Sequence, residues 1–466
     1  MNEIMIFFGK IAEGNMSEEQ NKTYVVEALD LTHDGLAVTR LEDGYTVFVE
    51  DLLKGESAEI EITHRKKNFG FGRVLSRLNR SPYRQAPKCK HFYECGGCQL
   101  MHMDYDVQIA FKRYRLELML KKIHQEDVEV EEIISMVNPY YYRNKVHVRF
   151  GNGENGIEAG FYKTKSHDLV NIEECFIMPK KSFQLLNLLR NLLNQYDIKA
   201  YDEKTKSGLI KSAVIREATK HKEILLLLNL SESRLPNEKM FIKRLSEQQP
   251  ELVGVGITKT GDDGYYLNKS IRLVYGKRFI HDTLLDVTYR IGFKSFFQVN
   301  PVQTERLYAK AIELADLSSK DKVIDAYSGI GTIALNVSKK VYKVFGIEQL
   351  KSAVHDAKRN AKMNKIRNAF FEVGDAEEVI EKWKKYDFDA IFVDPPRKGC
   401  KKRFLKTVID MRIKKVIYIS CNPATLGRDL EYLVEHGYQI QKVAPVDMFP
   451  QTSHVESVTL LTLKNA

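Results

Sequence analysis

The second half of the chain, from about residue 281, alternates short apolar runs rich in β-branched residues with stretches of helical periodicity. This alternation predicts an α/β fold in which helices cover both faces of a doubly wound parallel sheet. Five of the runs lead into a polar or reactive side chain. Parallel strands end at one edge of a sheet, so we expect these side chains to line one crevice. They are Asp325, Glu348, Asp375, Asp394 and Cys421.

A glycine-rich turn follows the first of these strands. Gly329 and Gly331 precede a predicted helix at 332–339, where they let the backbone approach a ligand closely. Glu348 follows about twenty residues later, a spacing at which a carboxylate binds ribose hydroxyls, and Asp375 can reach an adenine edge. There is neither a third glycine nor a P-loop lysine for phosphates, which favours S-adenosylmethionine. The alternative for each acid alone is a helix N-cap or turn residue.

Cys421 stands between the apolar run 416–419 and Asn422-Pro423. This position predicts a thiol just past the carboxyl end of a buried strand, where ligands and chemistry collect in open α/β sheets. The alternative is an inert core cysteine, because free cysteine is among the most buried residue types.

The N-terminal part predicts a flexible tail over 1–21 and a small β-structure over 22–80. Short apolar runs separated by glycines suggest a five-stranded barrel of the OB type. From Ile62 to Tyr93 there are nine bases and no acid, with Phe69 and Phe71 interleaved. A basic, aromatic face of this kind favours single-stranded RNA, and the alternative is ordinary solvated charge.

Three cysteines lie within ten residues, Cys89, Cys95 and Cys98, and Cys175 is the only other one in the first half. Four thiolates suit zinc or an iron–sulfur cluster, and their spacing alone does not choose between the two. Unrelated thiols are the alternative. With no visible signal peptide or membrane span, we expect a cytoplasmic protein whose clustered cysteines bind metal rather than form disulfides.

The central domain, 81–280, is predicted to be mixed and rich in sheet, with no catalytic signature. Helices are expected at 104–124 and 180–196, and strands at 209–216, 223–230 and 252–258. In the first helix the residues that follow the helical period are Val107, Ala110, Phe111, Tyr114 and Leu118.

Over nearly its whole length the chain resembles bacterial RNA 5-methyluridine methyltransferases, specifically the large-subunit (23S) rRNA type. Residues 22–80 resemble a TRAM domain, an RNA-binding β-barrel. The other motifs are Cys89-x5-Cys95-x2-Cys98 with Cys175, Phe296-Phe297-Gln298-Val299-Asn300, Asp325 to Thr332, Asp394-Pro-Pro-Arg-Lys-Gly, Ser420-Cys421-Asn422-Pro423 and His454-Val455-Glu456.

The resemblance implies a Rossmann-like, S-adenosylmethionine-dependent catalytic domain over 281–466, on which helix 104–124 packs. It implies a cofactor pocket lined by Gln298, Tyr327, Glu348, Asp375 and Asp394. It also implies a structural or RNA-orienting 4Fe-4S cluster, with zinc as the less favoured alternative, on Cys89, Cys95, Cys98 and Cys175.

The expected reaction follows from the weak nucleophilicity of carbon 5 of uracil. A thiolate that adds to carbon 6 makes carbon 5 nucleophilic toward the methyl group, and a base must then remove the carbon 5 proton. The resemblance assigns these roles to Cys421 and Glu456. Without it, Glu456 reads as a solvated carboxylate at a strand start. Cys400, in a basic loop near Asp394, is given no role.

The expected substrate is 23S rRNA, because the tRNA branch of the family usually lacks both TRAM domain and cluster. We expect a monomer with no membrane or obligate protein partner. The alternatives are a tRNA uracil-5-methyltransferase and a non-enzymatic RNA-binding iron–sulfur protein. A methyltransferase acting on an exocyclic amine is a further alternative, but it needs no cysteine, and Arg397 occupies the place of its base-stacking aromatic.

Overall fold

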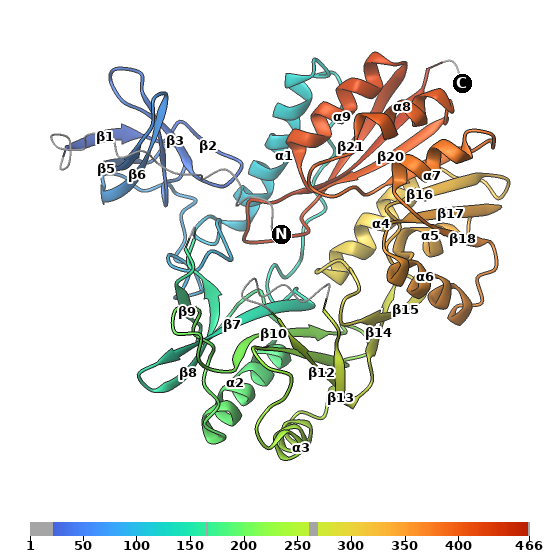
Figure 1. Ribbon diagram of the computed structural model, residues 1–466. Coiled ribbons are helices and arrows are strands. Elements are labelled where there is room, and N and C mark those ends of the chain that lie inside the picture. The colour runs from blue at the N-terminus through green and yellow to red at the C-terminus, as the bar shows by residue number, and fades with distance from the viewer. Residues whose placement is uncertain (1–21, 165, 261–268, 465–466) are drawn as a thin grey trace. The chain divides into compact units, whose positions relative to one another are not determined.

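The computed structural model describes residues 22–164, 166–260 and 269–464 (Figure 1). The chain divides into two compact units, Met1–Gln85 and Ala86–Ala466. The predicted flexible tail, 1–21, lies outside the described residues. Within the described ranges, no helix has both the length and the apolar character needed to cross a bilayer.

The first unit is a six-stranded sheet in the order β1-β5-β6-β4-β3-β2. Alternate residues of its strands, among them Val47, Ala58 and Ile60, point into a small apolar core. One strand more is present than the five expected, because β2 has only two residues and leaves no periodic signal. The strands are β1 (Thr23–Glu27), β2 (Asp30–Leu31), β3 (Ala37–Arg40), β4 (Thr46–Val49), β5 (Ser57–Arg65) and β6 (Phe69–Arg77).

The second unit begins with a seven-stranded mixed sheet in the order β13-β12-β11-β10-β7-β8-β9. Its central strands β10 and β11 are buried on both faces, in keeping with the apolar run Ile224–Leu228 of β11. Helices α2 (Lys180–Gln195) and α3 (Glu238–Gln248) cover one face, and the hairpin β14 (Phe279–Leu284)–β15 (Val287–Gly292) packs on the other. The strands are β7 (Lys145–Gly153), β8 (Gly156–Tyr162), β9 (Leu169–Asn171), β10 (Ile210–Glu217), β11 (Ile224–Leu230), β12 (Leu252–Lys259) and β13 (Arg272–Gly276).

The C-terminal sheet has the order β18-β17-β16-β19-β20-β22-β21. Its first five strands are parallel, and β22 is inserted antiparallel between β20 and β21. The predicted doubly wound fold is confirmed. The strands are β16 (Lys322–Ala326), β17 (Lys343–Glu348), β18 (Ala369–Val373), β19 (Ala390–Val393), β20 (Lys415–Ser420), β21 (Tyr438–Val446) and β22 (Glu456–Leu463).

Helices cover both faces of this sheet (Figure 1). On one face lie α4 (Pro301–Ala315), α5 (Thr332–Val337) and α6 (Lys351–Met363). On the other lie α1 (Tyr105–Lys122), α7 (Ala376–Trp383), α8 (Lys402–Asp410) and α9 (Pro423–Glu435).

Helix α1 comes early in the chain yet packs against α9 (Figure 1). The two helices approach closely at Gly427, where an added Cβ would lie 2.9 Å from Cγ of Met119. The buried face of α1 differs from the predicted stripe, since Tyr114 is exposed. The buried residues are Gln108, Lys112, Leu116, Met119 and Leu120. Two of them are polar, so an apolar period could not reveal this face.

Candidate active site

The turn after β16 has the backbone geometry that a ligand-binding turn needs. Gly329 and Gly331 have φ of 55° and 86°, a region that favours glycine. Tyr327 has φ of 68° despite its side chain, which marks local strain at this turn. The Gly329 amide donates to Glu348 Oε2 at 3.1 Å, so the acid that ends β17 also holds the turn in place.

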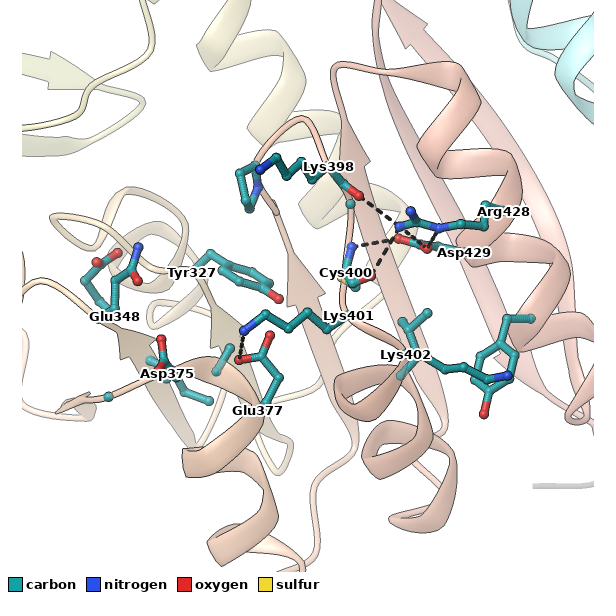
Figure 2. Close-up of a pocket in the computed structure, with 18 of the residues that line it drawn as sticks. Tyr327, Glu348, Asp375, Glu377, Lys398, Cys400, Lys401, Lys402, Arg428 and Asp429 are labelled. Atoms are coloured by element: carbon teal, nitrogen blue, oxygen red, sulfur yellow. Dashed lines mark hydrogen bonds and ion pairs between the residues drawn. The ribbon is translucent and has the colours of Figure 1, made fainter. Parts of the chain in front are cut away.

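A cavity of about 750 Å³ opens at this edge of the sheet (Figure 2). Figure 2 shows Glu348 and Asp375 on one side of it and Arg428 and Asp429 on the other. Three of the five predicted cofactor residues, Tyr327, Glu348 and Asp375, line it. Asp375 occupies the N-cap position of α7, but its side chain makes no capping bond.

The other two predicted cofactor residues lie together outside the lining of that cavity. Gln298 Nε2 donates to Asp394 Oδ2 at 3.4 Å. Burial raises the pKa of Asp394 to about 7, although the hydrogen bond from Gln298 acts in the opposite direction. The five predicted cofactor residues therefore form two groups. Tyr327, Glu348 and Asp375 line the cavity, and Gln298 bonds to Asp394, whose charge acts on Cys421.

The strand register brings Cys421 and Glu456 together. Strands β20 and β22 are antiparallel neighbours, and their last recorded pair is Ser420 with Ser457. The next residue of β20 is Cys421 and the preceding residue of β22 is Glu456, so the two stand side by side.

Burial and charge both act on this pair. Burial, together with the charges of Glu456 and Asp394 and against that of Arg397, raises the pKa of the Cys421 thiol to about 12. Burial and the negative charge of Asp394 hold the pKa of Glu456 well above its usual range. At neutral pH the Cys421 thiol is therefore protonated at rest, and bound substrate must favour the charged thiolate.

Arg397 and its neighbours are functional candidates that the sequence did not single out. Its guanidinium Nη2 lies 3.1 Å from His454 Nε2, and its backbone carbonyl accepts from Asn422 Nδ2 and Thr425 Oγ1, each at 3.1 Å. The Asp394-Pro-Pro-Arg loop is therefore tied to the turn that carries Cys421. The sequence signal was the Asp394-Pro-Pro-Arg motif itself. The partners of the Arg397 carbonyl are Asn422, the N-cap residue of α9, and Thr425 in the first turn of that helix.

Several buried polar atoms at this edge lack a protein partner. They are Asp325 Oδ1, Ser328 Oγ and Glu456 Oε2. Buried polar atoms are nearly always hydrogen-bonded, so such atoms at strand ends fit a site for a polar ligand. Donors such as the hydroxyl and amino groups of S-adenosylmethionine suit the carboxylates of this set, which makes the residues present compatible with that cofactor.

The four cysteines of the central domain come together. Burial raises the pKa of each thiol, and the thiols of Cys95, Cys98 and Cys175 are raised further by the charges of other members of the four. Backbone amides hydrogen-bond to the sulfurs of Cys89, Cys95 and Cys175. Amide donors stabilise thiolates, which are the form of cysteine that binds a metal.

The four sulfurs, all in described residues, are not arranged around one metal ion. Within the described ranges, no three His, Cys, Asp or Glu side chains form a group that could hold one metal ion. In a four-iron cluster each thiolate binds a different iron atom, so the sulfurs need not approach as closely as the ligands of one zinc ion.

Two arginines of the basic stretch 62–93 form ion pairs within the first unit. Arg84 bonds to both Glu56 and Asp51 inside the unit, and Arg77 pairs with the same two acids. Burial opposes the charge of Glu56, but hydrogen bonds from Arg84 and two backbone amides bring its pKa down to about 2. These two arginines therefore stabilise the unit and are withdrawn from the predicted RNA face.

The aromatic part of the same stretch forms a cluster. Phe48, Phe69 and Phe71 have ring centroids 5.5–5.9 Å apart. Lys66 lies 5.2 Å from the Phe69 ring and Arg65 lies 4.7 Å from the Tyr45 ring. Aromatic rings beside cations are the chemistry on which single-stranded bases stack.

The chain is similar to known RNA methyltransferases along most of its length. A family model described as tRNA (Uracil-5-)-methyltransferase matches residues 104–464, and a TRAM domain model matches residues 18–75. An uncharacterized RNA methyltransferase of Oceanobacillus iheyensis is 42% identical, covering 96% of this chain and 97% of its own. A second, from Bacillus cereus, is 41% identical, covering 95% and 97%.

A solved structure matches as well. The crystal structure of Pyrococcus abyssi tRNA (uracil-54, C5)-methyltransferase in complex with S-adenosyl-L-homocysteine has a TM-score of 0.76 to this chain at 28% sequence identity. The match covers 95% of this chain and 100% of that one.

Proposed function

This chain belongs to the tRNA (uracil-5-)-methyltransferase family and is an S-adenosylmethionine-dependent RNA (uracil-5-)-methyltransferase, and we propose that it methylates 23S rRNA through a covalent adduct with Cys421. The observation that carries the mechanism is the Ser420–Ser457 register, which sets a thiol beside a carboxyl group. Both groups stand at the ligand-binding edge of the sheet.

In the proposed reaction, Cys421 acts first as a nucleophile. Its thiolate adds to carbon 6 of a uracil that has been turned out of the RNA stack, and the ring becomes an enolate with a nucleophilic carbon 5. Glu456 acts last. It takes the carbon 5 proton, the ring double bond re-forms, and the thiolate leaves.

The cofactor half of the site is proposed for the residues around the turn after β16. Glu348 and Asp375 would hold the nucleoside, Tyr327 would line the same cavity, and Gln298 with Asp394 would face the reacting end. Bound S-adenosylmethionine supplies an electrophilic methyl group. Asp394 also lies close enough to Cys421 and Glu456 to influence the pKa of both, so it links cofactor and substrate.

For the central domain we propose a 4Fe-4S cluster on Cys89, Cys95, Cys98 and Cys175. The clustering of the thiols and their amide donors support it. All six cysteines are free, in keeping with the proposed cytoplasmic location. Anaerobically purified protein should contain about four irons per chain, and Cys98→Ser should lose them; stoichiometric zinc would favour the alternative.

The choice of 23S rRNA rests on the TRAM domain together with the four cysteines. The second candidate is tRNA, favoured by the Pyrococcus abyssi enzyme, whose title names tRNA and whose fold covers 95% of this chain. The aromatic cluster of the first unit suits an unpaired RNA strand in either case.

The deciding experiment supplies labelled S-adenosylmethionine with unmodified transcripts of 23S rRNA and tRNA. We expect label as 5-methyluridine in 23S rRNA, and none with Cys421→Ala. Label in tRNA alone would keep the mechanism and replace the substrate. Label in neither, from protein that binds the cofactor, would contradict the proposal.

A further inference from the structure

The loop that leads to Glu456 is held by residues from far earlier in the chain. We call residues 447–455, between β21 and β22, the base loop. Lys112 Nζ donates to Asp447 Oδ1 at 2.6 Å, and both side chains are fully buried. Tyr105 donates to the other carboxylate oxygen at 2.7 Å, and Arg115 donates to the carbonyl of Ser453 at 2.6 Å. Helix α1 thus holds both ends of the loop.

Gln108 of the same helix is the centre of this arrangement. Its Nε2 donates to the carbonyls of Leu100 and Met103, each at 2.9 Å, and to Gln451 Oε1 at 3.1 Å. Its Oε1 accepts from the backbone amide of Gln451 at 3.1 Å. Gln108 and Gln451 are both fully buried, so these bonds are not weakened by competing water.

The cysteine-rich segment, residues 89–100, contacts the same point of the base loop. The amides of Gln99 and Leu100 both donate to the carbonyl of Gln451 at 3.0 Å. Gln99 directly follows Cys98. Gln451 has φ of 68°, which a side chain rarely adopts, and such a conformation persists only where the surroundings hold it.

We propose that Gln108 and Gln451 are positioning residues for Glu456, and that they couple the cysteine-rich segment to the base. This inference rests on the proposed function, in which Glu456 removes the carbon 5 proton. Glu456 is the first residue of β22, directly after the base loop, so a displacement of Gln451 reaches it through five peptide units with no other element between. The cysteine-rich segment then acts on the last chemical step without touching the uracil.

The order of the steps makes this role measurable. Until the base acts, the adduct keeps its bond between sulfur and carbon 6, the new methyl group and the proton on carbon 5. When the proton passes to Glu456, the electron pair of the C–H bond forms the double bond and the thiolate departs. A misplaced base therefore slows release, and covalent enzyme–RNA adduct accumulates. Poor folding or weak RNA binding would lower the amount of adduct instead.

The test compares Gln108→Leu, which removes all four bonds at similar volume, with wild type. We expect kcat to fall roughly 10- to 100-fold, with kcat/KM for RNA unchanged because methyl transfer precedes the slowed step, and with a larger fraction of enzyme in denaturant-resistant adduct. Gln249→Leu is the matched control, because Gln249 is also a buried, hydrogen-bonded glutamine but lies in the central domain. It should release product like wild type. Unchanged kcat in Gln108→Leu, or a fall without extra adduct, would overturn the proposal.

A second measurement needs no substrate. Hydrogen exchange should be faster over 447–457 in Gln108→Leu than in wild type or Gln249→Leu, and unchanged over β16 and β17. Equal exchange in the base loop would overturn the coupling even if the enzyme methylates uridine. Faster exchange, with no 5-methyluridine formed by wild type, would support the coupling and refute the proposed function instead.

Discussion

Cys400 and Cys421 both lie at the ligand-binding edge of the C-terminal sheet. Their thiols have similar pKa values but different neighbours. Burial is the main cause that raises the pKa of each to about 12. Cys400 is buried at the wall of the 750 Å³ cavity, and its sulfur hydrogen-bonds to the hydroxyls of Tyr327 and Tyr418. Cys421 is half-buried and interacts with Glu456, Asp394 and Arg397.

The difference teaches that a buried thiol becomes a candidate nucleophile through access and neighbours. The polar groups around Cys400 are bonded to one another: Asp429 accepts from the Cys400 amide at 2.7 Å and from Tyr418 at 2.6 Å. Cys421 has the carboxyl group of Glu456 beside it and an arginine whose charge favours its thiolate. Assigning no role to Cys400 is compatible with these contacts, and four experiments can break or sharpen the contrast.

The largest effect should separate the two cysteines directly. Cys421→Ala should abolish methyl transfer, a loss of roughly 10⁵- to 10⁶-fold, because the thiolate that activates the ring is gone. Cys400→Ala should keep most activity and lose about 1 kcal/mol of stability. Initial rates and urea denaturation of both variants measure this. Equal losses of activity would erase the distinction.

Glu456→Gln should slow turnover roughly 100- to 10,000-fold by removing the base. The methyl group should still be transferred once, leaving enzyme bound covalently to methylated RNA. A single-turnover assay that separates methyl transfer from product release checks this. If Glu456→Gln blocked the first methyl transfer, the base would have to act earlier than proposed.

The pH dependence should report the surroundings of Cys421. With its pKa raised to about 12, the thiol is protonated at neutral pH, and Glu456 also has a raised pKa, so kcat/KM should increase with pH from 6 to 9. Arg397→Gln removes a charge that favours both anions and should lower kcat/KM about tenfold at neutral pH. Arg397→Lys keeps the charge and should retain the profile. A flat profile in wild type would contradict this assignment.

The smallest effect on activity is expected near Cys400. Asp429→Asn turns an acceptor of three bonds into a partial donor and should cost about 1–3 kcal/mol of stability. Activity should fall only severalfold, since Asp429 acts on the loop rather than on the uracil. Asp410→Asn, at an exposed ion pair, is the control and should change stability by less than about 1 kcal/mol. Denaturation midpoints distinguish the two.

Local patterns predicted much of the fold. Strands β10, β11 and β12 begin and end within about one residue of the expected bounds, because apolar runs and the residues that break them act locally. Predictions failed where packing is polar: α1 buries Gln108 and Lys112 rather than its predicted apolar stripe. The two-residue β2 and the internal pairing of Arg84 with Glu56 likewise depended on contacts that no local pattern encodes.

By itself, the sequence determined the doubly wound fold and the chemical groups at its strand ends, since short-range hydrophobic periodicity and motif spacing specify both. Only the tertiary structure decided that Glu456 stands beside Cys421, because β22 enters the sheet antiparallel to β20 after a long excursion through α9 and β21. It also decided that Lys112 meets Asp447, 335 residues away. Contacts of that range form only when the whole domain packs, and here they hold the loop that leads to Glu456.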